Sequence, residues 1–231
     1  MQNQLVFPIS IYFCKTVART KKNLLFFCLL ISSFISAQTD WELQKNENGI
    51  SVYTKDQPNS GFKEIKAVAV FNSSLSGLIA LLTDIPSHPT WLYRCKQTKL
   101  LKTISSTELY YYVETYVPWP VSNRDGVIYF KTSQDSKTKV VTVSSRVIPG
   151  MLPETKGVVR VPKLVSTWKF TPRGDGTVTA EYQLDINPGG DVPSWIVNMF
   201  SVDGPYESIM SMRKKLAEDK YKSAKFDFIT E

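Results

Sequence analysis

The sequence predicts an α+β domain in which a C-terminal helix covers an antiparallel β-sheet. Strand-like runs follow one another from residue 99 to residue 186 without the intervening helices of a β-α-β order. Within residues 177–186 apolar and polar side chains alternate, which is the period of a half-buried strand. Residues 193–217 instead carry apolar side chains at helical spacing. A sheet that is apolar on one face needs a cover, and this helix is the candidate.

The first part of the chain predicts a hairpin, a long strand and a short helix. Asn48-Gly49 separates two strand-like runs, and this dipeptide favours a tight hairpin turn. Residues 62–71 alternate well enough to form a long strand. Ser73-Ser74 then offers an N-cap for a helix whose apolar residues, from Leu75 to Leu82, have helical spacing.

The rest of the chain predicts further strands and the closing helix. The expected strands are residues 99–104, 108–117, 126–132, 139–145, 164–171 and 177–186, and most of the turns between them are rich in Ser, Asp or Gly. Residues 147–162 form a longer irregular stretch. Gly204-Pro205 lies inside the closing helix and is expected to kink or interrupt it, because proline cannot donate the backbone hydrogen bond of a helix interior.

Alternation also predicts which side chains enclose a cavity between sheet and helix. The sheet side chains expected there are Ile128, Phe130, Val178, Ala180, Tyr182 and Leu184, and those of the helix are Trp195, Met199 and Tyr206. The small Ala180 predicts a gap in the middle of its strand. Tyr111 points to the face opposite Tyr110 and Tyr112, and it either gives a ligand a hydroxyl group or is an ordinary strand aromatic.

Residues 1–37 have the pattern of a secretory signal peptide. Lys21-Lys22 precede the apolar stretch 24–31, and Ser36-Ala37 precede Gln38. A membrane-spanning helix needs about 20 apolar residues, more than this stretch holds. We therefore expect export to the periplasm or the medium, with association with a membrane as a further expectation. An N-terminal membrane anchor is the alternative. Residues 1–20 are long for a leader, which is consistent with an over-extended N-terminus.

Charge, cysteine and histidine content argue against several functions. The net charge is +7, but four basic residues lie before residue 38, and without them 24 basic residues face 21 acidic ones. This weakens any nucleic-acid interpretation. The chain after residue 37 keeps one cysteine, Cys95, which allows neither an intramolecular disulfide nor a cysteine metal site. The single histidine, His88, lies between two prolines and is expected to be a loop residue without a catalytic partner.

Four segments together resemble the START (StAR-related lipid transfer) domain family. A single one of these motifs would be weak, but all four occur, and the resemblance covers residues 41–220. The segments are PWPVSNRD at 118–125, MLPETKGVVR at 151–160, VSTWKFTP at 165–172 and NPGGDVPSWIVN at 187–198. The resemblance implies a helix-grip fold, a curved antiparallel sheet wrapped around a long C-terminal helix with an internal hydrophobic cavity. It also implies binding or transfer of a lipid, usually without catalysis.

Two positions within the resemblance affect the ligand and the fold. Family members that bind sterols or phospholipid headgroups tend to carry an arginine six residues after the arginine of the R-D turn, and this chain has Phe130 there. The resemblance therefore does not carry sterol or phosphatidylcholine specificity over to this chain. Arg124 and Asp125, the R-D pair, are expected to form a structural ion pair that holds a loop, with ligand contact as the alternative.

These observations predict a signal peptide at 1–37, a START lipid-binding domain at 38–222 and a C-terminal tail at 223–231. The expected function is non-catalytic binding or transfer of a hydrophobic, lipid-like ligand, by a monomer that contacts membranes transiently. We expect no catalytic residue, metal, cofactor or nucleic-acid partner. The alternatives are a cyclase- or hydrolase-like enzyme on the same fold, acting on a hydrophobic substrate, and a structural periplasmic protein with a filled core.

Overall fold

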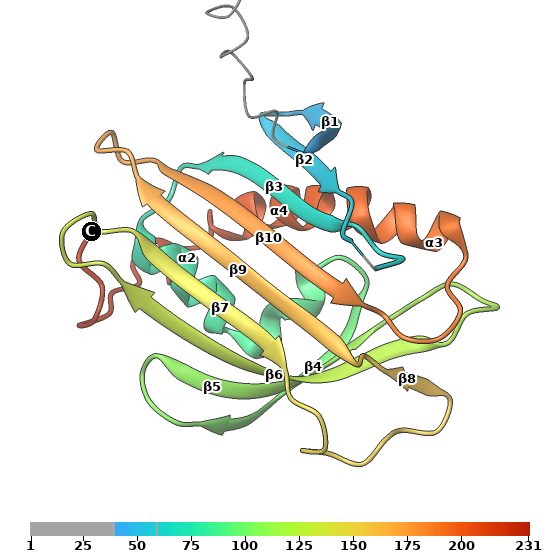
Figure 1. The fold of residues 1–231 in the computed structure, drawn as a ribbon. Helices are drawn as coiled ribbons and strands as arrows, with labels where there is room; N and C mark the ends of the chain where they lie inside the picture. The colour runs from blue at the N-terminus through green and yellow to red at the C-terminus, as the bar shows by residue number, and fades with distance from the viewer. Residues whose placement is uncertain (1–39, 59) are drawn as a thin grey trace, which may run out of the picture. The chain divides into compact units, whose positions relative to one another are not determined.

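The computed structural model describes residues 40–58 and 60–231, so the predicted signal peptide lies outside the described residues. Contacts divide the chain into two units, Met1–Asp40 and Trp41–Glu231, and every element below belongs to the second. Figure 1 shows a large curved sheet with helices against one of its faces. The strands are β1 (Glu42–Glu47), β2 (Ile50–Lys55), β3 (Glu64–Phe71), β4 (Cys95–Thr103), β5 (Glu108–Thr115), β6 (Asn123–Gln134), β7 (Val141–Val147), β8 (Val158–Arg160), β9 (Lys163–Pro172) and β10 (Val178–Asn187).

The sheet confirms the predicted α+β, helix-grip class. Its order is β1-β2-β3-β10-β9-β7-β6-β5-β4, and each neighbouring pair on this path is antiparallel. The Asn48-Gly49 hairpin is present, with both residues at positive φ, as a type I′ turn requires. One strand was not predicted. The short β8 lies in the stretch expected to be irregular and pairs in parallel with the start of β6. Three residues are too few to show alternation.

The helices are α2 (Leu75–Thr83), the 3₁₀ helix η1 (Ile85–Thr90), α3 (Ser194–Asn198), the π-helical turn η2 (Met199–Asp203), α4 (Gly204–Lys215) and α5 (Asp219–Lys222). Ser74 caps α2 as predicted, because its Oγ accepts a hydrogen bond from the Gly77 amide at 3.0 Å. None of the described helices is long and apolar enough to span a membrane.

The closing helix runs from α3 through η2 to α4, and Figure 1 shows α3 and α4 one after the other along the sheet. The predicted interruption at Gly204-Pro205 takes the form of the π-helical turn just before it. Pro205 cannot donate a backbone hydrogen bond to the preceding turn, and a wider turn at this place accommodates that loss. The chain stays helical, so side chains before and after Pro205 both reach the sheet.

One end of the space between sheet and helices is filled with side chains. Ala69, Phe170 and Ala180 lie side by side on three neighbouring strands and are buried beneath Ile209 and other apolar side chains of α2 and α4. The segment 223–231, expected to be a tail, packs against this end. The Glu231 carboxylate accepts hydrogen bonds from the amides of Leu75 and Ser76 at 2.7 and 3.0 Å. It thereby satisfies free amides at the start of α2.

Candidate ligand-binding cavity

The other end of the same space is hollow. It holds two chambers of about 180 and 230 Å³, which we name the Arg124 chamber and the Tyr111 chamber after one lining residue of each. The two chambers share the lining side chains Val113, Thr115, Ile128, Leu164, Leu184 and Phe200, so they adjoin one another. The shared residues come from the sheet and from the π-helical turn. The closing helix therefore covers two adjoining chambers.

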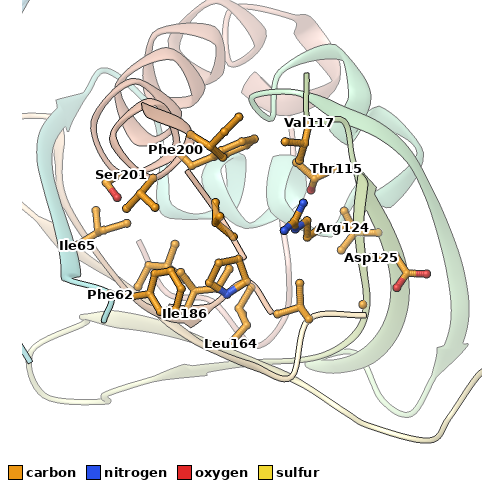
Figure 2. A pocket seen from close by; sticks show the side chains of 18 of the residues that line it. Phe62, Ile65, Thr115, Val117, Arg124, Asp125, Leu164, Ile186, Phe200 and Ser201 are labelled. Atoms are coloured by element: carbon orange, nitrogen blue, oxygen red, sulfur yellow. The ribbon is translucent and has the colours of Figure 1, made fainter. Parts of the chain in front are cut away.

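The Arg124 chamber is lined mainly by apolar side chains. Figure 2 shows Phe62, Ile65, Leu164, Ile186 and Phe200 around it. Ile196 and Val197 contribute from α3, and Pro188 and Val192 from the connection between β10 and α3. Three charged residues, Lys63, Arg124 and Asp125, also line this chamber.

Arg124 and Asp125 do not pair with each other, contrary to the predicted ion pair. They are neighbours on β6, and successive side chains of a strand point to opposite faces. The Asp125 carboxylate instead pairs with Arg160 of β8, with Nε–Oδ1 and Nη2–Oδ2 distances of 2.6 and 3.2 Å. The Tyr112 hydroxyl donates to the same carboxylate at 3.1 Å. Asp125 thus ties β5 and β8 to β6.

Arg124 holds a different loop. Its guanidinium donates hydrogen bonds to the backbone oxygens of Ser122 and Gly189 at 2.6 and 3.1 Å. Gly189 and Gly190 both have positive φ, and their tight turn between β10 and α3 brings the Gly189 carbonyl to this position. Arg124 is buried, and burial lowers the pKa of its guanidinium from the ordinary value.

The Tyr111 chamber is aromatic and carries hydroxyl groups. Its polar side chains include Tyr111, Tyr182, Ser145 and Ser166, and its large apolar ones include Phe130 and Trp168. Burial raises the pKa of Tyr111, and it raises the pKa of Tyr182 to about 12. Both phenols are therefore neutral near pH 7 and can donate a hydrogen bond.

His88 lines this chamber, and it lies in a 3₁₀ helix rather than in the loop that the sequence predicts. It lies in η1, is buried, and packs edge-to-face against Trp91 and Tyr111 with ring centroids 5.0 and 5.4 Å apart. Burial lowers the pKa of His88 to about 4, so the ring is neutral near pH 7. Its Nε2 hydrogen donates to the Leu82 carbonyl at 3.0 Å, and Nδ1 has no partner among the described residues.

The structure places five of the predicted cavity residues around the chambers and five elsewhere. Those that line a chamber are Tyr111, Ile128, Phe130, Tyr182 and Leu184. Val178 and Ala180 lie on the expected face of β10 but at its other end, in the filled core. Alternation gives the face of a strand, whereas the position along the strand decides between the hollow and the filled end.

Three helix residues were also predicted to face the chambers and do not line them. Trp195 is 49% exposed, because the turn of α3 directs Ile196, Val197 and Phe200 inward instead. Met199, one turn after Trp195, is partly buried and lines neither chamber. Tyr206 is buried at the β1–β2 hairpin, where its hydroxyl accepts a hydrogen bond from Asn48 Nδ2 at 2.5 Å and the Lys45 ammonium lies over its ring.

Several lining residues were missed by the sequence reasoning. Val113 and Thr115 follow Tyr111 at two-residue steps on β5, so the alternation that selected Tyr111 also contained them. Phe200 could have been found as the residue one helical turn after Ile196. Phe62 was expected at the start of the strand 62–71 but lies in the connection before β3, and Pro188 lies in the connection after β10, so alternation does not place either side chain.

The histidine, aspartate and cysteine side chains near the chambers are neutral or paired. Among residues 40–58 and 60–231, no group of three or more His, Cys, Asp and Glu side chains is placed to hold a metal ion. His88 is neutral and its Nε2 hydrogen is bonded to a carbonyl, while the Asp125 carboxylate is paired with Arg160. Cys95 is buried, and burial raises the pKa of its thiol to about 12.

Replacing Cys95 with alanine is expected to leave ligand affinity within about threefold, since a buried thiol behaves as a small apolar group. In the folded wild-type protein the thiol should react with iodoacetamide far more slowly than in the urea-unfolded chain at the same pH, because the thiolate is the reactive form. Mass spectrometry of the alkylated protein measures both rates. Equal rates, or a large loss of affinity in the variant, would contradict this assignment.

Comparison with known proteins agrees with the fold. Residues 28–221 match the START domain family model. An uncharacterized protein of Pseudomonas aeruginosa is 35% identical over 174 residues, which cover 75% of this chain and 85% of that protein. The human phosphatidylcholine transfer protein is 30% identical over 175 residues, covering 73% and 79%. The crystal structure of a STAR-related lipid transfer protein from Xanthomonas axonopodis has a TM-score of 0.72 and 31% identity, covering 78% of this chain and 100% of that one.

Proposed function

This chain belongs to the START domain family, and on that premise we propose that it binds one hydrophobic, lipid-like ligand in the two chambers and carries it without catalysing a reaction. The observation that carries the proposal is the pair of adjoining chambers between the closing helix and the sheet, lined mainly by apolar and aromatic side chains. The lipid transfer activity named for the human and Xanthomonas relatives supports the same class of ligand. The neutral His88 and the paired Asp125 favour binding over acid–base chemistry.

The proposal is tested by native mass spectrometry of the protein purified from its own host, followed by extraction and identification of the bound molecule. We expect one chain with one hydrophobic ligand. The purified protein should also accelerate movement of that ligand from labelled to unlabelled vesicles. A ligand-free chain that binds no lipid from a host extract would contradict the proposal, and conversion of the ligand to a product would favour the enzyme alternative.

We further propose that the protein meets membranes through exposed tryptophans near the Arg124 chamber. Trp119 is 88% exposed, and it follows the lining residue Val117 by two positions. Trp195 is 49% exposed and precedes the lining residue Ile196. Tryptophan favours the boundary between water and the apolar part of a bilayer.

Trp119→Ala is therefore expected to slow vesicle-to-vesicle transfer roughly tenfold, which corresponds to about 1.4 kcal/mol of lost membrane interaction. Ligand affinity measured without vesicles should change little, because Trp119 does not line either chamber. Leu43→Ala is the matched control, since Leu43 is 53% exposed on β1 and lines neither chamber. An equal effect of both substitutions on transfer would contradict the proposed contact.

Export is also proposed, and it is supported by the sequence pattern at residues 21–38. N-terminal sequencing of the cell-associated protein is expected to give a start near Gln38. An intact chain recovered from the cytoplasm would overturn this proposal.

A further inference from the structure

Two of the three charges in the Arg124 chamber are already neutralised. The Lys63 ammonium lies 3.1 and 3.2 Å from carboxylate oxygens of Glu42 and Asp56. The Asp125 carboxylate is fully buried and is paired with Arg160. Neither group needs a charge from a ligand.

Arg124 differs from both. It is 7% exposed, and among the described residues its nitrogens form no ion pair with any carboxylate. The two hydrogen bonds that it donates go to neutral backbone oxygens, those of Ser122 and Gly189. Figure 2 shows its guanidinium nitrogens directed into the chamber, whereas the Asp125 carboxylate points the other way. Arg124 is therefore a buried cation without a counter-charge on an apolar hollow.

Burying a charge without a partner costs free energy. The Arg124 guanidinium also has N–H donors beyond the two that bond to Ser122 and Gly189. It carries five N–H groups in a planar fork, which matches the oxygens of a carboxylate or a phosphate. A ligand that brings such an oxygen pair would replace water lost by the guanidinium and would neutralise its charge.

The Tyr111 chamber shows which way such a ligand would lie. No Asp, Glu, Lys or Arg lines it, and its histidine is neutral. Because the two chambers adjoin, a ligand can place its apolar chain in the Tyr111 chamber while its charged end lies beside Arg124. Together the two volumes lie near the lower end of the roughly 300–1,000 Å³ of ligand pockets. This size favours one chain over two.

Resting on the proposed lipid-binding function, we propose that Arg124 binds the anionic head, carboxylate or phosphate, of a single-chain amphiphile whose tail fills the Tyr111 chamber. For Arg124 the proposal adopts ligand contact, the alternative to the structural role that the sequence analysis expects. The structural role of Asp125 is kept.

The wild-type protein tests the proposal with pairs of ligands that differ only in charge. We expect palmitate to bind roughly 10- to 100-fold more tightly than methyl palmitate, because only the acid gains a hydrogen bond between two charged groups. Lysophosphatidate with one palmitoyl chain should likewise bind more tightly than monopalmitoylglycerol, by a similar factor. Whichever anion binds more tightly identifies the head group.

Dipalmitoyl phosphatidate is expected to bind more weakly than its one-chain counterpart. Titration calorimetry or displacement of a fluorescent fatty-chain probe measures these affinities.

Substitution of Arg124 separates head recognition from support of the loop. In Arg124→Gln the preference for palmitate over its methyl ester should fall to within about threefold, because only the charged ligand gains from the guanidinium. Arg124→Lys keeps a cation but loses the planar fork, so part of the preference should remain. Arg173→Gln, at the exposed β9–β10 turn, is the matched control and should keep the full preference.

The outcomes are distinct. Equal affinity of the wild-type protein for acid and ester overturns the role of Arg124 while the lipid-binding function stands. An equal loss of affinity for both ligands in Arg124→Gln also overturns it, because that result assigns Arg124 to the loop alone. Tight binding of the two-chain phosphatidate overturns the single-chain assignment. Binding of none of these ligands overturns this inference, whereas the proposed function falls only if the protein also binds no lipid from the host extract.

Discussion

Asp125→Ala is expected to lower the free energy of unfolding by about 3–5 kcal/mol, because it leaves the Arg160 guanidinium without its counter-charge in a nearly buried position. The side chains of the pair are 0% and 11% exposed, and the bond from Tyr112 to the carboxylate is lost as well. Arg160 also donates to the Leu152 and Pro153 carbonyls, so the segment before β8 should loosen together with β8. Urea unfolding at neutral pH measures the loss.

Asp185→Ala is the matched control for this prediction. The Lys163–Asp185 pair has the same shortest distance, 2.6 Å, but its side chains are 53% and 30% exposed. Exposed pairs contribute about 0–1 kcal/mol, since water screens them and both side chains lose freedom. If the two substitutions lower the free energy of unfolding equally, burial does not distinguish the two ion pairs, and the structural role assigned to Asp125 is wrong. A double variant, Asp125→Leu with Arg160→Met, should recover part of the loss, because it removes both buried charges.

The fold could be predicted from the sequence because most strands alternate between apolar and polar side chains and most turns contain residues that favour turns. Asn48-Gly49 and Ser74 act on their immediate neighbours, so their roles could be inferred without knowing the rest of the molecule. The short β8 has no such local pattern. Its place is fixed by pairing with β6 and by the Arg160–Asp125 bonds, which join residues 35 positions apart.

The cavity could be predicted only in part, because it depends on what lies above each position of the sheet. Alternation placed Tyr182, Leu184 and Ala180 on one face of β10, and all three lie there. The residues covering that face differ along its length. The filled end is covered by α2, α4 and the segment that ends at Glu231, whereas the hollow end is covered by α3, the π-helical turn, the start of α4 and η1. The burial of His88 was not predicted, because it depends on packing against Trp91 and on Tyr111 of a distant strand.

Leu184→Trp and Ala180→Trp are expected to have opposite effects, although the two residues share one face of one strand. Leu184 lines both chambers. A tryptophan there can extend into the hollow, so ligand affinity should fall by about 100-fold or more. The free energy of unfolding should change by about 1 kcal/mol or less, because the larger side chain fills empty space. Ala180 is 1% exposed, between Ala69 and Phe170 in the filled core. A tryptophan there must displace its neighbours, and we expect a loss of about 3 kcal/mol or more in the free energy of unfolding.

Urea unfolding and ligand titration on both variants measure this contrast. The sequence alone favours the reverse for position 180, because a small residue in the middle of a strand face suggests a gap that a large side chain could fill. The structure shows the small residues Ala67, Ala69 and Ala180 in the buried core with Ile209 and Met212 of α4, so small side chains here allow close approach of the helix instead. A stable Ala180→Trp protein that has lost ligand binding would place the hollow at this end of the sheet. A Leu184→Trp protein that still binds its ligand would show that the ligand lies outside both chambers.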